Sequence, residues 1–228
     1  MDFLPTIEVE TAPNPNTSII WMHGLGADGN DFVPMVKELD FCLPDPTRFV
    51  FPHAPMVPVT INSGYVMRAW YDILLPDMSL SEDEKGIRRT QLEIDKLIAR
   101  ERSRGVASRK IMLAGFSQGG AMALHTGLRY PEKLAGILAL STYLPLPATL
   151  PAEAQAANSN TPIFMAHGVM DNVVPLALGQ ASRDHLTHLG YQVEWHDFPM
   201  AHSVCMEEVT DIGAFITRAF GWATMTKV

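Results

Sequence analysis

Six short apolar runs recur along the chain, and segments with helical periodicity separate them. The runs cover residues 18–23, 48–53, 110–115, 135–140, 162–167 and 192–198. Short runs that alternate with helices are typical of buried strands in βαβ units. Such units build a mostly parallel sheet with helices packed on both of its faces. The chain is therefore predicted to be an α/β protein, with its functional loops at the carboxyl ends of the strands.

The segments between the runs carry the start and stop signals of helices. Residues 81–84 have the form of a capping box, and Gly105 is expected to end the amphipathic helix that follows. Further helices are expected after Ser117 as far as Pro131, over about 175–189, and over about 204–220, with Ser203 able to cap the last one. Residues 145–160 read as a surface loop with room for one short helix.

Composition narrows the class of protein. The chain has 228 residues, a length that fits one α/β domain spanning 1–228. Its net charge of −8 argues against a nucleic-acid partner, and no apolar stretch is long enough to span a membrane. The acidic N-terminus does not resemble a signal peptide, and Cys42 and Cys205 read as free thiols. A cytoplasmic protein is expected.

Ser117 is the candidate nucleophile, because it lies at the centre of the sequence GFSQG, between an apolar run and a helical segment. In a G-x-S-x-G nucleophile elbow, a strained strand-to-helix turn lifts the serine hydroxyl out of the backbone, and only small neighbours fit. The alternative is an ordinary turn in which Ser117 caps the helix. Gly119 and Gly120 would weaken a helix start for no structural gain, so the elbow is preferred.

A serine hydroxyl needs a base that removes its proton, and the base needs an orienting carboxylate. In α/β-hydrolases these groups follow the serine in the order acid, then histidine. Asp171, in the loop after the run at 162–167, is the preferred acid, and His202, after the final run, is the candidate base. Asp197 competes for the role of acid, whereas Asp184 reads as a solvated helical residue. An exposed loop histidine is the alternative for His202.

The sequence GLGADG, residues 24–29, formally matches the glycine fingerprint of dinucleotide binding. Asp28 and Asp31 would repel a pyrophosphate there, and the next strand ends in FPHAP without the acid that contacts the ribose. A hydrolase instead needs two preorganised N–H donors that stabilise the oxyanion of a tetrahedral intermediate. Leu25 and Gln118 are the candidate donors, and no cofactor is expected.

Three other histidines were considered as ligands or supports. His185 and His188 lie one turn apart on a predicted helix, a spacing that suits metal ligands. No third ligand follows at a suitable spacing, so a polar helix surface is preferred and no metal is expected. His167 precedes the candidate acid and is expected to fix its loop by hydrogen bonds.

Six sequence blocks together resemble the acyl-protein thioesterase and carboxylesterase group of the α/β-hydrolases. They cover nearly the whole chain and read, in order, HGLGADGNDF, FPHAP, MRAWYDI, GFSQGGAMAL, HGVMDNVVP and MAHSVC. The resemblance implies an α/β-hydrolase fold without a large lid domain, and hydrolysis of carboxylic esters and thioesters without a cofactor. It places the nucleophile on Ser117, the acid on Asp171, the base on His202, and the oxyanion donors on Leu25 and Gln118.

The resemblance leaves the substrate open among short-chain esters, lysophospholipids and S-acylated proteins. The acyl group is expected to bind against the apolar stretch at 56–78, with Trp70, Tyr71 and Leu75 as candidate contacts, although that stretch serves equally well to cover the core. Two alternatives remain: a catalytically silent member that binds acyl chains or proteins, and an acyltransferase. Monomer and homodimer are both compatible with the sequence.

Overall fold

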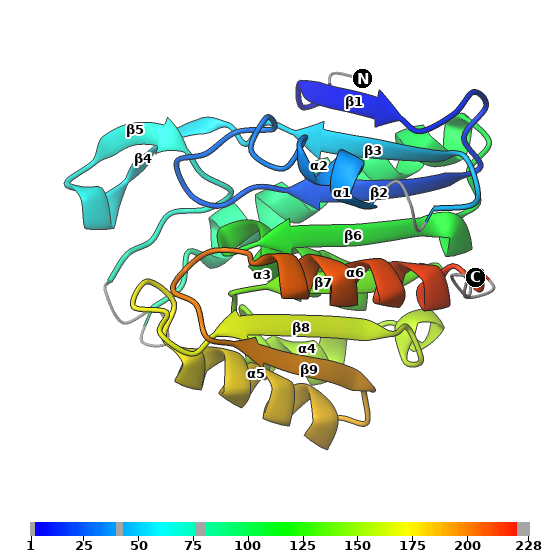
Figure 1. Cartoon of the computed structure of the whole chain (residues 1–228). Coiled ribbons are helices and arrows are strands. Elements are labelled where there is room, and N and C mark those ends of the chain that lie inside the picture. Colours follow the sequence, from blue (N-terminus) through cyan, green and yellow to red (C-terminus); the bar gives the residue numbers. More distant parts are fainter. Residues whose placement is uncertain (1–2, 40–42, 76–80, 223–228) are drawn as a thin grey trace.

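A seven-stranded sheet forms the centre of the structure, a computed structural model that describes residues 3–39, 43–75 and 81–222 (Figure 1). Its strands are β1 (Thr6–Glu10), β2 (Thr17–Met22), β3 (Thr47–Pro52), β6 (Ile111–Phe116), β7 (Gly136–Leu140), β8 (Ile163–Gly168) and β9 (Val193–Phe198). They lie in the order β1-β3-β2-β6-β7-β8-β9, and only β1 runs antiparallel to its neighbour. The predicted mostly parallel sheet is confirmed.

Helices cover both faces of this sheet. The α-helices are α1 (Met35–Leu39), α2 (Glu84–Ser103), α3 (Gln118–Arg129), α4 (Leu150–Glu153), α5 (Leu176–His188) and α6 (Met206–Ala219). Short 3-10 turns are η2 (Thr60–Asn62), η3 (Ser108–Lys110), η4 (Pro147–Thr149) and η5 (Ala156–Asn158). Among the described residues, no helix combines the length and apolar character that crossing a membrane requires.

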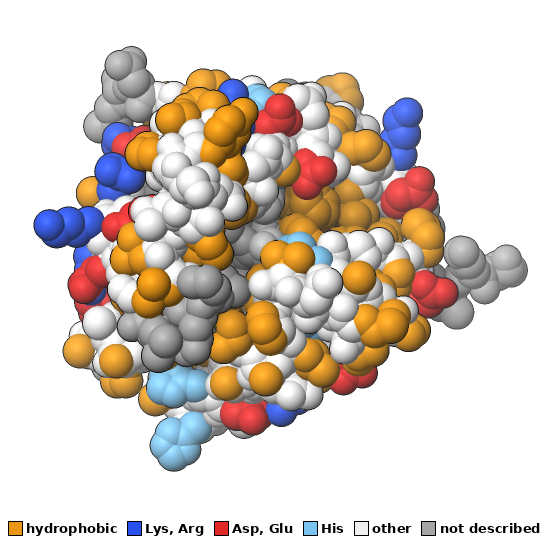
Figure 2. Space-filling view, turned by 90° about the vertical axis from the view of Figure 1, so that its left-hand side faces the viewer, with side chains coloured by type: hydrophobic (Ala, Val, Ile, Leu, Met, Phe, Trp, Pro, Cys, Tyr) orange, Lys and Arg blue, Asp and Glu red, His pale blue; other side chains and the backbone are white. Residues whose placement is uncertain are grey.

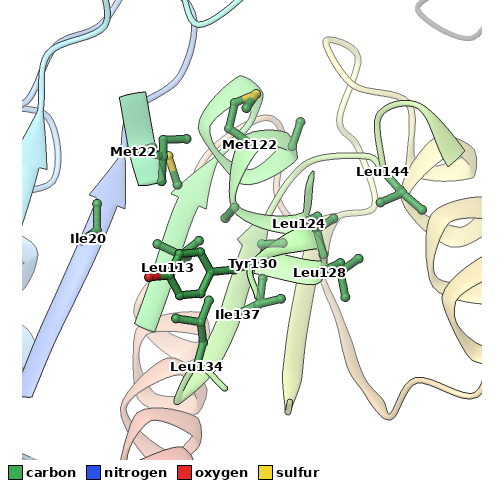
Figure 3. Packing of buried hydrophobic residues seen from close by; sticks show 14 of the residues in the cluster. Ile20, Met22, Leu113, Met122, Leu124, Leu128, Tyr130, Leu134, Ile137 and Leu144 are labelled. Carbon is green, nitrogen blue, oxygen red and sulfur yellow. The ribbon is translucent and has the colours of Figure 1, made fainter. Parts of the chain in front are cut away.

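Two apolar cores lie on opposite faces of the sheet, because successive side chains of a strand point to opposite sides. On the central strand β6, Leu113 packs into the core beneath α2, α3 and α5, where Figure 3 shows it close to Leu134 and Ile137. Its neighbour Met112 enters the other core, which α1 and α6 cover. Figure 1 shows α6 in front of the sheet and α2 and α3 behind it. This is the predicted α/β-hydrolase arrangement, and no lid domain is inserted among the described residues.

The strand β1, the helix α1 and the two strands of a hairpin were not predicted from the sequence. β1 lies at the edge of the sheet and mixes apolar with acidic residues, and α1 is only five residues long. A separate hairpin of β4 (Met56–Val59) and β5 (Tyr65–Arg68) occupies part of the stretch predicted to bind the acyl group. The end of that stretch, like Cys42, lies outside the described residues.

Two predicted helix caps were wrong. Asp83, and not Ser81, caps α2, because its carboxylate accepts a hydrogen bond from the Gly86 N–H at 2.9 Å. Asp83 is favoured because the same carboxylate also accepts from the Asp72 N–H, at 3.0 Å, and so ties a loop to the helix. At the start of α6, Cys205 holds the cap position without a side-chain hydrogen bond, and Ser203 lies outside the helix.

All six parallel strands end at the same edge of the sheet, on the left in Figure 1. The strand register aligns the ends of β2 and β6, where Met22 pairs with Gly115, and those of β8 and β9, where Gly168 pairs with Phe198. The loops that follow β2, β6, β7, β8 and β9 therefore meet. Figure 2 looks onto this edge and shows hydrophobic side chains around a hollow.

A buried ion cluster at the opposite end of the molecule ties α2 to the first strands. The carboxylate of Glu101, which is fully buried, accepts hydrogen bonds from Arg48 on β3 at 2.8 Å and from Arg104 at 3.1 Å. Arg48 also bonds Glu10 on β1, at 2.9 Å. The cluster crosses from the helical layer to the edge strand, so it compensates for the few apolar contacts that β1 makes.

Glu101→Ala is expected to lower the free energy of unfolding by about 3 kcal/mol, because it removes a fully buried carboxylate and leaves the largely buried Arg48 guanidinium without one of its two close carboxylate partners. The matched variant Glu93→Ala removes a more exposed ion pair with Lys96 on the same helix and is expected to cost less than about 1 kcal/mol. Urea unfolding followed by circular dichroism measures both. Equal losses for the two variants would contradict a structural role for the cluster.

Candidate active site

Ser117 lies at the junction of β6 and α3 in a strained conformation, with φ of 54° and ψ of −122°. Its N–H donates to the Leu140 carbonyl at 2.8 Å, and its carbonyl accepts from the Thr142 hydroxyl at 2.7 Å, so β7 and the loop after it hold the turn. Its side chain makes no cap hydrogen bond with α3. The turn therefore has the geometry of an elbow, and the alternative of an ordinary helix cap does not describe it.

Glycines make this elbow possible because the backbone passes very close to its neighbours. A Cβ atom at Gly119 would lie 2.2 Å from the carbonyl oxygen of Met22 at the end of β2. A Cβ atom at Gly115 would lie 2.3 Å from the backbone of Gly119. The contact between α3 and the end of β2 thus depends on the absence of side chains, and it sets the position of Ser117 at the sheet edge.

His202 and Asp171 come together from the loops after β9 and β8. His202 Nδ1 lies 2.6 Å from Asp171 Oδ2, a hydrogen bond that orients the imidazole. The other carboxylate oxygen, Oδ1, accepts from the N–H groups of Val173 and Val174 at 2.8 and 2.9 Å. The carboxylate is therefore held at both ends, and its side chain is fully buried.

The imidazole also lies close to the elbow. Its ring packs against Phe116, the residue before Ser117, with 4.6 Å between the ring centroids. In the described part of the chain, no hydrogen bond joins the Ser117 hydroxyl to His202. His202 is thus hydrogen bonded to Asp171, and its ring contact with Phe116 places the imidazole beside the elbow.

The competing acids lie elsewhere. Asp197 is exposed on β9, and among the described residues its carboxylate accepts only a 3.5 Å hydrogen bond from the Trp195 indole. Asp184 is exposed on α5 and pairs with Arg183. His167 bonds the Val174 carbonyl through Nε2 at 2.8 Å, as expected for a residue that fixes the loop. Burial lowers its pKa, so the imidazole stays neutral.

The two candidate oxyanion donors face one cavity together with Ser117. Leu25, Ser117 and Gln118 all line a cavity of about 230 Å³, which is called the acyl cavity below. A Cβ atom at Gly24 would lie 3.4 Å from the Ser117 Cβ, so the glycine loop runs beside the elbow. Gln118 begins α3, and its N–H has no acceptor within the helix.

The glycine loop lacks the helix that a dinucleotide fingerprint requires. Turns follow Gly29, and α1 begins only at Met35. The Leu25 N–H has no acceptor among the described residues, whereas the N–H groups of Gly26 and Gly29 are bonded to the Arg68 carbonyl and the His53 ring. The Leu25 N–H is therefore available to a ligand, while the N–H groups of Gly26 and Gly29 hold the loop in place. Within the described residues, no cluster of three His, Cys, Asp or Glu suits a metal, and this includes His185 and His188.

A buried network that the sequence analysis missed supports this loop. The Ala54 N–H donates to His23 Nε2 at 3.1 Å, so the proton of the ring is on Nδ1, which donates to the Gly24 carbonyl at 2.7 Å. The Trp70 indole donates to the His23 carbonyl at 2.8 Å. The Gln118 side chain accepts from the Trp70 N–H and donates to the Tyr71 carbonyl, both at 2.7 Å.

The three predicted acyl contacts therefore have different environments. Trp70 is fully buried and braces the loop through its indole; it does not line the acyl cavity. Leu75 is 42% exposed and does not line it either. Tyr71 does line it, together with Tyr143. Ile61, Asn62 and Ile73, which also line it, belong to the predicted stretch at 56–78, whereas the lining residues Val173 and Val174 were not predicted.

Comparison with known proteins agrees with this geometry. A family model described as Phospholipase/Carboxylesterase matches residues 5–219. The chain belongs to the phospholipase/carboxylesterase family. The resemblance inferred from the six sequence blocks is thereby confirmed.

Relatives of this family member match over most of their length. Acyl-protein thioesterase 1 of Neurospora crassa is 41% identical and covers 94% of this chain and 91% of its own. Acyl-protein thioesterase 1 of Saccharomyces cerevisiae is 36% identical and covers 89% of this chain and 92% of its own. The crystal structure of Zea mays acyl-protein thioesterase 2 has a TM-score of 0.85, with 26% identity over 96% of this chain and 100% of that chain. Arabidopsis thaliana SOBER1 has a TM-score of 0.83, with 30% identity over 89% of this chain and 98% of that chain.

The His23 network predicts acid sensitivity. Burial lowers the pKa of His23 from 6.5 to about 4, so the folded chain binds this proton less readily than the unfolded chain. The contribution of His23 to the free energy of unfolding is complete above about pH 6.5 and is lost as the pH falls towards about 4, by roughly 3 kcal/mol in total. His23→Asn is expected to be less stable at neutral pH, yet to lose less stability between pH 7 and pH 4.

Denaturant unfolding at several pH values measures this difference. The control His188→Asn removes an exposed histidine and is expected to keep the pH dependence of the wild type. A His23→Asn variant with the same pH dependence as the wild type would show that this histidine does not need to be neutral in the fold.

Proposed function

We propose that this chain is a serine hydrolase that cleaves carboxylic esters and thioesters through an acyl-enzyme on Ser117. The observation that carries the proposal is the 2.6 Å hydrogen bond between His202 Nδ1 and Asp171, in an imidazole packed beside the elbow. Asp171 accepts through both oxygens, so the proton between the two residues resides on the imidazole. His202 Nε2 then carries a lone pair and can act as a base.

The mechanism follows from these positions. His202 Nε2 takes the hydroxyl proton as Ser117 Oγ attacks the acyl carbon. The negative charge that develops on the acyl oxygen is stabilised by the N–H groups of Leu25 and Gln118, two residues in the wall of the acyl cavity. The imidazolium gives its proton to the alcohol or thiol as that group leaves. Water, activated by the same nitrogen, then attacks the acyl carbon and releases the acid and the free Ser117 hydroxyl.

The proposed mechanism includes closure of the imidazole onto the hydroxyl when substrate binds. Catalytic hydrogen bonds are often long before substrate binds, and the serine χ1 rotates freely. The contact between Phe116 and the imidazole keeps the ring at the elbow in the meantime. The backbone around Ser117 is fixed from Leu140 and Thr142, so the nucleophile does not need to be assembled by a conformational change.

The substrate class follows from the cavity and the relatives. Apolar side chains, among them Leu25, Ile61 and Ile73, line most of the acyl cavity, which suits an acyl chain. Relatives are named acyl-protein thioesterases, so a thioester joins the oxygen esters as a candidate substrate. We also propose one domain over residues 1–228 and a cytoplasmic location. The free thiol of Cys205 agrees with a reducing compartment.

Ser117→Ala is expected to lower kcat/KM for p-nitrophenyl butyrate and for an acyl thioester by about 10⁴-fold or more, because no nucleophile remains. The thermal transition should stay within a few degrees of the wild type. The control Ser159→Ala changes an exposed serine far from the site and is expected to keep full activity. Retained turnover by Ser117→Ala, at a rate within tenfold of the wild type, would refute the assignment of the nucleophile.

Asp171→Asn is expected to lower kcat by about 10⁴-fold, because an amide cannot hold the imidazole in the required tautomer. Asp197→Asn provides the matched comparison, since it makes the same change in the competing acid and is expected to alter kcat less than twofold. Steady-state kinetics on one ester measure both variants. If the two effects were reversed, Asp197 would be the orienting acid.

A further inference from the structure

A second and larger cavity shares the lining residue Tyr143 with the acyl cavity. Its volume is about 490 Å³, and it is bordered by the loop after β7, η4 and one face of α5. Apolar side chains dominate its walls, among them Leu144, Leu146 and Leu178. Its lining includes none of the proposed catalytic residues Ser117, Asp171 and His202.

Two polar side chains in the walls of this second cavity are hydrogen bonded, whereas the buried Nε2 of His185 has no hydrogen-bond partner among the described residues. The Ser182 hydroxyl accepts from the Leu144 N–H at 2.8 Å and donates to the Leu178 carbonyl at 2.7 Å. The Glu82 carboxylate accepts from the Leu146 N–H at 3.0 Å. These groups need no ligand, and the space between them suits an apolar chain.

One side chain belongs to both cavities. Tyr143 lines the acyl cavity on one side and the second cavity on the other. Its hydroxyl lies 2.9 Å from that of Tyr71, which also lines the acyl cavity, and both side chains are buried. A small void of about 10 Å³ is lined by both tyrosines, by Ile73 of the acyl cavity and by Glu82 of the second cavity, so the two spaces approach each other at the tyrosine pair.

The hydrogen bond between the two tyrosine hydroxyls holds these rings in place between the cavities, and the two rings are called the partition. Burial raises the pKa of Tyr143 to about 12 and that of Tyr71 well above its usual range, so both hydroxyls remain neutral and one can donate to the other. Rotation of either ring away from the partition would leave a buried hydroxyl without its partner. The rings therefore resist displacement by an acyl chain.

We propose that the Tyr71–Tyr143 pair sets the acyl-chain length that this enzyme accepts, by closing the acyl cavity off from the second cavity. This inference rests on the proposed function. At about 230 Å³, the acyl cavity is smaller than the roughly 300–1,000 Å³ of sites that enclose drug-sized ligands. It holds a short or medium acyl chain, and the end of a longer chain gains no further buried contact. The two cavities joined would enclose a long chain.

The test compares kcat/KM for p-nitrophenyl esters from acetate to palmitate, as ratios within each variant. The wild type is expected to prefer short or medium chains. Tyr143→Ala is expected to shift the preference to longer chains, with the ratio of laurate to butyrate rising by about tenfold or more, since each newly buried methylene contributes about 0.8 kcal/mol. The variant Tyr143→Phe keeps the ring but removes the hydroxyl that bonds Tyr71, so it is expected to shift the preference in the same direction by less than Tyr143→Ala does.

A second substitution tests whether the shift in Tyr143→Ala arises because acyl chains enter the second cavity or because the whole site becomes less rigid. Ala181 on α5 lines only the second cavity, so the double variant Tyr143→Ala/Ala181→Trp refills that space. It is expected to return the preference to short chains. If Tyr143→Ala does not fold, Tyr143→Leu replaces it, with a smaller shift in the same direction.

The outcomes distinguish this inference from the proposed function. A wild type that already prefers palmitate, or an unchanged preference in Tyr143→Ala, would overturn the partition while leaving the hydrolase intact. If the double variant Tyr143→Ala/Ala181→Trp keeps the long-chain preference, long acyl chains do not occupy the second cavity. This result would also overturn the inference. Absence of ester hydrolysis in the wild type would refute the proposed function itself.

Discussion

The close approach of α3 to the end of β2 is the constraint on which the site depends. No side chain fits between Gly119 and the Met22 carbonyl, so the chain must turn sharply as it leaves β6. That turn places Ser117 at a φ of 54°, which non-glycine residues rarely adopt. The strain is maintained by hydrogen bonds to the Leu140 carbonyl and from the Thr142 hydroxyl. As a result, the Ser117 hydroxyl lies above a rigid sheet edge. The other groups of the candidate site are positioned around it.

The loops around the elbow are connected by buried polar groups, and this connection links the site to the core. His23 bonds two loops at once, and the Trp70 indole and the Gln118 side chain join these loops to α3. Gln118 thus has two separate tasks in this account: its side chain holds the Trp70 segment, and its backbone N–H is the proposed oxyanion donor of a residue that lines the acyl cavity. A substitution at Gln118 would alter the loop geometry even though the backbone donor remains.

The sheet and the positions of Ser117, Asp171 and His202 in loops after strands could be predicted from the sequence, because both depend on local patterns. Apolar runs mark β2, β3, β6, β7, β8 and β9 to within about a residue, and in a parallel sheet the loops after such strands must share one edge. The strand β1 was missed because its alternating acidic residues lie at an edge, bonded to arginines of other elements. The capping-box prediction was wrong because the Asp83 carboxylate accepts a hydrogen bond from the N–H of Asp72, a contact that the local sequence does not indicate. The lining of the acyl cavity, Tyr143 included, arises from tertiary packing and leaves no local signal.

The central claim is that the Ser117 hydroxyl is made nucleophilic by an imidazole from a loop 85 residues further along the chain. The most direct test is to treat the folded protein at neutral pH with a fluorophosphonate and to locate the adduct by peptide mass spectrometry. The account predicts one adduct, on Ser117, which is lost when the protein is unfolded in urea before treatment and greatly slowed in His202→Ala. An unmodified protein, or an adduct on another residue in the folded state, would contradict it.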